Sequence, residues 1–260
     1  MNYNKVIELV LEAKKFITSD HINEFKMKGD NDFVTIVDTN ISDFLKGELN
    51  ALYPEIGFFS EEEDGKLSGD CWILDPIDGT TNLVYGYNMS SVSLARYVEG
   101  EGVVFGVVYQ PFTNEIFTAI KGEGAYYNHT KLMKVSDRQP NKAIVEFGAG
   151  STRKENADEN FAIASKLFKK IADFRRICST ALVLSFIADG RIDGYFEKII
   201  KPWDIAAGSL FIEEAGGKIT DYFGNPIDFA NPKTTVVVSN GIAHDTILET
   251  IKEVLGESHD

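Results

Sequence analysis

An apolar strand that runs directly into two carboxylates constrains this chain more than any other feature of its sequence. Residues 72–82 read WILDPIDGTTN, so that Asp75 and Asp78 follow the strand with Pro76 fixing the turn between them. A strand end delivers side chains to the edge of a sheet, and Gly79 with its polar followers suits a turn whose free N–H groups hold an anion. Metal and phosphate can therefore meet here, although an isolated Asp-x-x-Asp pair more often only caps a turn.

Two further acidic segments can reach the same sheet edge. Residues 60–64, SEEED, follow the apolar strand 56–59, and Asp204 opens a helix that begins WDIAAG. Taken separately, the first is a solvated loop and the second a helix N-cap. Carboxylates that converge need cations or raised pKa values, because they cannot all stay ionised cheaply. Oxygen ligands without His or Cys favour Mg²⁺ or Mn²⁺ over Zn²⁺, and a bridging carboxylate can hold two ions for displacement at phosphorus.

Length and charge bound the classes that remain. The 260 residues suffice for a substantial core, and we expect one domain over 1–260 with a soft boundary between the halves 1–140 and 141–260. The net charge is 26 − 40 = −14, which repels nucleic-acid phosphates and anionic lipid. No run approaches the roughly 20 apolar residues that cross a bilayer. We therefore expect neither nucleic acid nor membrane as a partner.

Cysteines and histidines argue against other chemistries. Cys71 and Cys178 lie far apart in apolar surroundings, which predicts buried, reduced thiols and a cytoplasmic location. The histidines lie outside the acidic motifs, so zinc chemistry and a Ser-His-Asp triad have no support. We expect all four at the surface or in loops: His21, His129, His244 and His259.

Hydrophobic periodicity predicts layered helices and sheets. An amphipathic helix occupies the N-terminus, and a second helix, capped by Asp38 or Thr39, carries apolar residues from 41 to 52. An antiparallel meander is expected from strands at 56–59, 71–74, 91–98, 103–109 and 115–120. Strands and helices then alternate: strands at 143–147, 174–177, 192–196 and 235–238, and helices at 155–171, 180–188, from 203 or 204 to the glycines at 216–217, and 243–255.

Four segments together resemble one protein family. Residues 75–82, DPIDGTTN, match its first signature at every position, and residues 203–208, WDIAAG, match its second. Residues 32–38 look like its early Asp-x-Val-Thr-x-x-Asp segment, and residues 122–125, GEGA, like its Gly-rich hairpin. The chain thus resembles the inositol monophosphatase family of lithium-sensitive, magnesium-dependent phosphatases over nearly its whole length. The resemblance implies an α+β fold, layered as an α-β-α-β-α sandwich, and a homodimer.

The same resemblance implies a metal site for two or three Mg²⁺ ions, which Mn²⁺ can replace. The ligands of the first ion would be Glu61, Asp75 and the carbonyl of Ile77. The second would be held by Asp75, which bridges the two, together with Asp78 and Asp204. A third, weaker ion would be held through Glu61 and waters.

Catalytic and substrate-binding roles follow from the resemblance as well. Thr80 and Glu62 would lie near an activated water, with Asp38 orienting the threonine. The backbone N–H groups of Gly79 and Thr80 would hold the phosphate. The remaining substrate contacts would come from Ser179 and Glu197, the latter bonding sugar or inositol hydroxyls.

The activity that the resemblance implies is Mg²⁺-dependent hydrolysis of a small phosphate monoester, either an inositol monophosphate or a sugar phosphate. Cys178 replaces the usual Gly and Val183 a frequent Asp, which predicts a narrower and drier pocket than an inositol site. Fructose 1,6-bisphosphate is an alternative substrate. A 3'-phosphonucleotide is less favoured, because residues 81–82 are Thr-Asn where such phosphatases usually carry Lys-Glu. A non-catalytic regulatory protein on the same fold is the alternative of another class.

Overall fold

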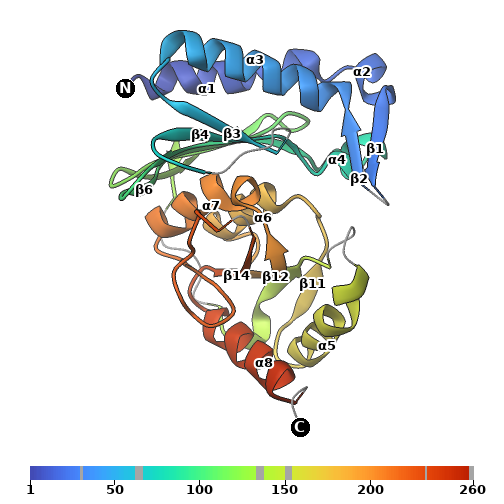
Figure 1. Cartoon of the computed structure of the whole chain (residues 1–260). Coiled ribbons are helices and arrows are strands. Elements are labelled where there is room, and N and C mark those ends of the chain that lie inside the picture. The colour runs from blue at the N-terminus through green and yellow to red at the C-terminus, as the bar shows by residue number, and fades with distance from the viewer. Residues whose placement is uncertain (30–31, 62–66, 133–137, 150–153, 232, 258–260) are drawn as a thin grey trace.

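Two β-sheets alternate with three layers of helices through the molecule (Figure 1). The computed structural model describes residues 1–29, 32–61, 67–132, 138–149, 154–231 and 233–257. The outer helices are α1 (Tyr3–Glu12) and α3 (Ile36–Leu52) at one end, and α5 (Ala157–Phe168) and α8 (His244–Glu257) at the other. Between the sheets lie α6 (Thr180–Ala188) and α7 (Pro202–Glu214). This order of layers confirms the α-β-α-β-α sandwich.

The first sheet has seven strands in sequence order, β3 to β9. From β4 onward, neighbouring strands pair antiparallel, which confirms the meander, whereas β3 pairs parallel to β4. The strands are β3 (Gly57–Ser60), β4 (Cys71–Asp78), β5 (Ser91–Val98), β6 (Gly102–Gln110), β7 (Glu115–Ile120), β8 (Gly124–Tyr127) and β9 (Thr130–Lys131).

The second sheet has five strands in the order β11-β10-β12-β14-β13. β10 runs parallel to both of its neighbours, while β14 pairs antiparallel with β12 and β13. The strands are β10 (Ile144–Phe147), β11 (Asp173–Arg175), β12 (Gly194–Ile200), β13 (Lys218–Thr220) and β14 (Thr234–Ser239). A separate hairpin joins β1 (Phe25–Gly29) to β2 (Asp32–Thr35), and two short α-helices are α2 (Ser19–Asn23) and α4 (Thr80–Val84). Short 3-10 helices lie at Ala13–Phe16, Pro140–Lys142 and Lys154–Asn156.

Three apolar clusters fill the spaces between the layers. The first joins α1 and α3 to the seven-stranded sheet, and the third joins α5 and α8 to the five-stranded sheet. The central cluster is shared by both sheets and contains most of α6 and α7, including Leu184 and Phe211. Each such side chain stabilises the fold by roughly 1.5–3 kcal/mol when fully buried. Because α6 is apolar on every side, it suits this central position.

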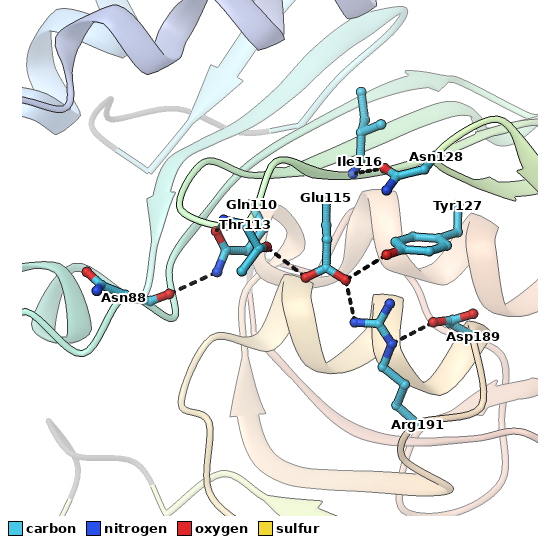
Figure 2. Close-up of polar contacts among 9 residues, drawn as sticks. All are labelled: Asn88, Gln110, Thr113, Glu115, Ile116, Tyr127, Asn128, Asp189 and Arg191. Carbon is cyan, nitrogen blue, oxygen red and sulfur yellow. Dashed lines mark hydrogen bonds and ion pairs between the residues drawn. The ribbon is translucent and has the colours of Figure 1, made fainter.

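A polar network links the seven-stranded sheet to the second half of the chain (Figure 2). Arg191, in the turn before β12, donates to Glu115 Oε1 over 2.6 Å and pairs with Asp189 over 2.7 Å. Glu115 also accepts from Thr113 over 2.7 Å and from the Tyr127 hydroxyl over 3.1 Å. This carboxylate thus fixes the start of β7 against the α6–β12 connection.

Two expectations about single residues are wrong. Both cysteines are free thiols and Cys71 is buried, but Cys178 is exposed, in a left-handed turn (φ 61°) ahead of α6. His244 is buried instead of exposed, with its Nε2 3.0 Å from Thr220 Oγ1, and burial lowers its pKa to about 4. His129 is exposed, and His259 lies outside the described residues. Among the residues described, no helix combines the length and apolar character needed to cross a membrane.

A candidate metal and phosphate site at the end of β4

A bulge at the end of β4 brings the first two carboxylates together. Every residue of β4 is buried, and the strand continues through Pro76 to Asp78 instead of ending at residue 74. Asp75 pairs with Ser93 and Asp78 with Ser91, so three steps along β4 match two along β5. Proline has no N–H for the ladder, which favours the irregularity at this point. Residues three apart in a regular strand face opposite sides, and the bulge removes that separation.

A third carboxylate arrives from the central helix layer. Asp204 is the third residue of α7, and its Oδ2 accepts the Lys201 N–H over 3.0 Å. Oxygen atoms of Asp75, Asp78 and Asp204 all lie within 4.8 Å of one another. The structure therefore brings together three of the four acids singled out in the sequence.

Glu61 contributes its charge from just outside this group. It follows β3, and its N–H donates to the Leu74 carbonyl over 3.3 Å, beside Asp75. Burial is the main cause of the raised pKa of Asp75, and the negative charge of Glu61 raises it further. The same charge also raises the pKa of Asp204. Glu62 lies outside the described residues.

The electrostatics of the cluster favour a bound cation. Burial raises the pKa of Asp75 and Asp204, and mutual repulsion raises both further. Burial also raises the pKa of Asp78 to about 6, against the opposing hydrogen bond from Ser179. Among the described residues, no donor reaches the buried Asp75 Oδ1. An all-oxygen set with an unpaired buried acceptor fits a hard divalent cation such as Mg²⁺.

Thr80 lies between a carboxylate and a backbone carbonyl. Its hydroxyl is 3.1 Å from Asp38 Oδ1 and 2.9 Å from the Ile77 carbonyl oxygen, and its one proton serves one acceptor at a time. Asp38 is held in turn by Thr35, whose N–H and hydroxyl donate to Oδ2 over 2.8 and 2.6 Å. Thr35 is the N-cap of α3, which corrects the expectation that Asp38 or Thr39 caps this helix. A capping box thus fixes the carboxylate that faces Thr80.

Gly79 makes the turn from β4 into α4. It has φ 87°, and a Cβ there would lie 3.1 Å from the Met89 carbonyl oxygen and 3.2 Å from Ser179 Cβ. The Ser90 hydroxyl donates to its carbonyl over 2.8 Å. Glycine alone meets both requirements, because it tolerates the left-handed conformation and leaves room for the neighbouring chain.

Ser179 and α6 hold Asp78. The Ser179 hydroxyl and the Ala181 N–H donate to Asp78 Oδ2 over 2.7 and 2.6 Å. Ser179 is fully buried, so its hydroxyl is directed to the carboxylate. Val183 is also fully buried, within the central cluster.

Glu197 lies on β12, half-buried, on the side that faces the helices of the central layer. The Tyr195 hydroxyl donates to Glu197 Oε2 and lies 3.2 Å from Thr180 Oγ1. A Cβ at Gly148 would come within 2.1 Å of the Glu197 carboxyl carbon, so this glycine leaves the space that the side chain fills. The charge of Glu197 also raises the pKa of Asp204, which places it within electrostatic reach of the cluster.

Sequence reasoning missed two polar residues beside this site. Glu146 is 1% exposed in β10 and Asn82 is 8% exposed in α4, and both bond the segment that precedes Ser179. Asn82 belongs to the matched motif at 75–82. Glu146 is the one acid in the apolar run 143–147, which is the signal that could have marked it.

Comparison with known proteins agrees with this geometry. The model of the inositol monophosphatase family matches residues 2–255. Nus factor SuhB of Escherichia coli K12 is 40% identical over 218 residues, which cover 82% of this chain and 80% of that protein. The solved IMPase of Thermotoga maritima is 29% identical, with a TM-score of 0.87 and 98% of both chains covered. A solved IMPase/NADP phosphatase, complexed with Mg²⁺ and phosphate, is 28% identical, with a TM-score of 0.83 and 95% and 94% covered. This chain belongs to the inositol monophosphatase family.

Proposed function

We propose that this protein is a Mg²⁺-dependent phosphatase that hydrolyses a small phosphate monoester and releases inorganic phosphate. The proposal depends above all on one observation, the meeting of Asp75, Asp78 and Asp204 within 4.8 Å. It is supported by the family of the chain and by the Mg²⁺ and phosphate present in one solved relative. An inositol monophosphate or a sugar phosphate is the substrate class that we favour.

The metal ligands of the proposal are the acidic cluster and its neighbours. Asp75, Asp78 and Asp204, with Glu61 and the Ile77 carbonyl, would hold two or three Mg²⁺ ions, with Mn²⁺ as a substitute. Bound Mg²⁺ supplies positive charge that lowers the pKa of water and stabilises the oxygens of attack and departure at phosphorus.

The other residues of the site would orient the reactants. Asp38 would accept a hydrogen bond from the Thr80 hydroxyl. The lone pairs of that hydroxyl would then accept a hydrogen bond from the attacking water. Free N–H groups at Gly79 and Thr80, where α4 begins, would hold the phosphate. Glu197 would accept hydroxyl protons of the alcohol, and Glu62 remains a predicted catalytic residue. We assign the Ser179 hydroxyl to holding Asp78.

The test is phosphate release from a panel of monoesters, measured in Mg²⁺ and again after chelation. The panel contains inositol 1-phosphate, fructose 1,6-bisphosphate, NADP and 3'-phosphoadenosine phosphate, so relative turnover also separates the alternative activities. We expect release in Mg²⁺ only. The proposal is wrong if none of these substrates releases phosphate under either condition.

A matched pair of variants ties the activity to the cluster. Asp78→Asn keeps the volume and an acceptor for Ser179 but removes the charge, and we expect kcat/KM to fall on the order of 100-fold. Glu99→Gln, on an exposed turn between β5 and β6, should leave kcat/KM unchanged. Wild-type turnover by Asp78→Asn would remove the cluster from the mechanism.

A regulatory binding role is a second candidate, because the 40% identical SuhB is named a Nus factor. A pure, folded protein that binds Mg²⁺ yet hydrolyses no member of the panel would favour that role.

From the family resemblance we also propose a homodimer and inhibition by lithium. Sedimentation equilibrium at twice the chain mass and loss of turnover in LiCl are the expected results.

A further inference from the structure

Glu146 is a buried carboxylate that holds a neighbouring loop. Its Oε1 accepts the N–H groups of Ile177 and Cys178 over 2.8 and 2.9 Å. Only 1% of the residue is exposed, and burial raises its pKa to about 7 against these two bonds. A buried acid is costly to fold, and these two backbone contacts, together with the charge of Arg176, offset part of this cost. The other oxygen, Oε2, has no partner among the described residues.

Asn82 holds the same loop from the opposite side. Its Nδ2 donates to the Ile177 carbonyl over 2.7 Å and to the Met89 carbonyl over 2.7 Å. Residues 177–178 therefore have their N–H groups bound by one side chain and a carbonyl bound by another. We call Glu146 and Asn82 together the loop clamp.

The clamped loop has an unfavourable backbone conformation. Cys178 has φ 61°, and a side chain in this left-handed region costs roughly 1–2 kcal/mol. Such a residue persists where its surroundings determine the conformation, and here the loop clamp supplies those surroundings. The turn at Cys178 directs the following residues, Ser179 and Ala181, to donate to Asp78.

We propose that Glu146 and Asn82 are positioning residues of the metal site. By fixing the turn at Cys178 they orient the Ser179 hydroxyl and the Ala181 N–H, and these two donors fix the carboxylate of Asp78. The role given to Asp78 depends on the proposed function. Both clamp residues act through this loop and not by contact with substrate.

The test compares Mg²⁺ affinity between a variant that removes the hydrogen-bond acceptor at position 146 and one that keeps it. Glu146→Ala removes both contacts, and we expect the Mg²⁺ dissociation constant from calorimetry to rise about 10- to 100-fold. Glu146→Gln keeps an amide oxygen for the two N–H groups and should stay within about 3-fold of wild type. Glu99→Ala, on the exposed β5–β6 turn, is the control for loss of an acid.

A second substitution tests the turn itself. Because glycine adopts positive φ without support, adding Cys178→Gly to Glu146→Ala should recover part of the lost Mg²⁺ affinity. Asn82→Ala opens the other side of the loop clamp and should weaken Mg²⁺ binding in the same way. It provides an independent measurement if Glu146→Ala fails to fold.

Several results would overturn the proposal. A purely structural role would lower the unfolding temperature of Glu146→Ala or Asn82→Ala but leave the Mg²⁺ dissociation constant of the folded protein unchanged. Equal impairment of Glu146→Gln and Glu146→Ala would show that charge matters and acceptor geometry does not. Calorimetry measures Mg²⁺ binding independently of turnover. A wild-type protein that releases no phosphate would therefore refute the proposed function, while the Mg²⁺ dissociation constants of the variants would still test the role of the loop clamp.

Discussion

Asp78 is subject to two opposing influences at the residue scale. Burial favours its protonated form and raises its pKa to about 6, while the donors Ser179 and Ala181 favour the carboxylate. The side chain is thus held in place by neutral donors, and its charge is left for a cation to neutralise. Asp75 is less well satisfied, because its Oδ1 has no donor among the described residues.

The first prediction concerns the stability of Asp78→Asn without metal. A carboxylate whose pKa rises from 3.8 to about 6 on folding costs stability above pH 6, up to about 3 kcal/mol at full ionisation. In chelator at pH 8, Asp78→Asn should therefore unfold at a higher temperature than wild type. The difference should shrink as pH falls from 6 towards 4, because wild-type Asp78 then takes up its proton in the folded state.

Thermal unfolding of both proteins across this pH range measures the effect. The difference between them cancels groups that Asp78 does not influence, such as His244, but it includes the altered titration of Asp75 and Asp204, whose pKa values the charge of Asp78 raises. In saturating Mg²⁺ the order should reverse, because the variant loses part of the stabilisation that metal binding gives. A variant that is less stable than wild type at pH 8 in chelator would contradict the cost assigned to burying the charge of Asp78.

At the element scale, the motif at residues 203–208 supplies both a site residue and small residues that allow close helix packing. Asp204 belongs to the cluster, whereas Ala207 and Gly208 let α7 approach its neighbours closely. A Cβ at Gly208 would lie 2.5 Å from Leu184 Cβ in α6, and one at Gly106 in β6 would lie 3.0 Å from Ala207 Cα. Small residues therefore set the depth at which α7 presents its carboxylate.

The second prediction is that Gly208→Ala destabilises the fold. The added methyl overlaps α6, and overpacking of this kind costs about 1–3 kcal/mol. Gly47→Ala is the control, because it lies in α3 with open space at its Cβ and should raise stability by roughly 0.5–1 kcal/mol. Denaturant unfolding compares the two, and equal stability of Gly208→Ala and wild type would show that α6 and α7 can move apart freely.

Periodic elements were predictable from sequence, while irregular ones were not. The bounds predicted for β5, β7 and α6 agree with the structure residue for residue, because each is an apolar segment with clear ends. β4 was predicted too short, since Pro76 argues for a turn and the bulge that accommodates it depends on β5. The hairpin of β1 and β2 was missed, because its strands are only five and four residues long and give too short a pattern.

The site residues follow the same distinction between local patterns, which were predictable, and long-range contacts, which were not. Its carboxylates were predicted because they lie in local motifs at strand and helix ends. Glu146 was missed because its partners lie 31 and 32 residues away and a single acid carries no spacing signal. The cap of α3 was placed three or four residues too late, at Asp38 or Thr39, since Thr35 and Asp38 form a reciprocal pair in which Asp38 can be taken for the cap.

At the scale of the whole molecule, the apolar cluster around α6 and α7 is built from both halves of the chain. It includes Ile73 and Phe117 from the first sheet, and Tyr195 and Val238 from the second. Helices α6 and α7 lie between the sheets and cover a face of each (Figure 1). We therefore propose that the chain folds as one domain, with the change of sheet near residue 140 marking a topological division only.

The third prediction follows from that shared cluster. Residues 1–140 and 141–260, expressed separately, should each fail to show cooperative thermal unfolding. The first piece loses the helices that cover one face of its sheet, and the second exposes the apolar sides of α6 and α7 that pack against the first sheet. Circular dichroism melts of the two pieces, with the full chain as the control, measure this. A cooperative transition in either piece alone would show that its half is an independent domain.

The position of Asp204 on α7 also has a consequence for the order of events during synthesis. This carboxylate follows Asp78 by 204 − 78 = 126 residues, yet both belong to one cluster. A growing chain that has emerged only as far as its first sheet has the two β4 aspartates but not the third acid. Under the proposed function, the three-carboxylate site is therefore complete only after α7 has been synthesised.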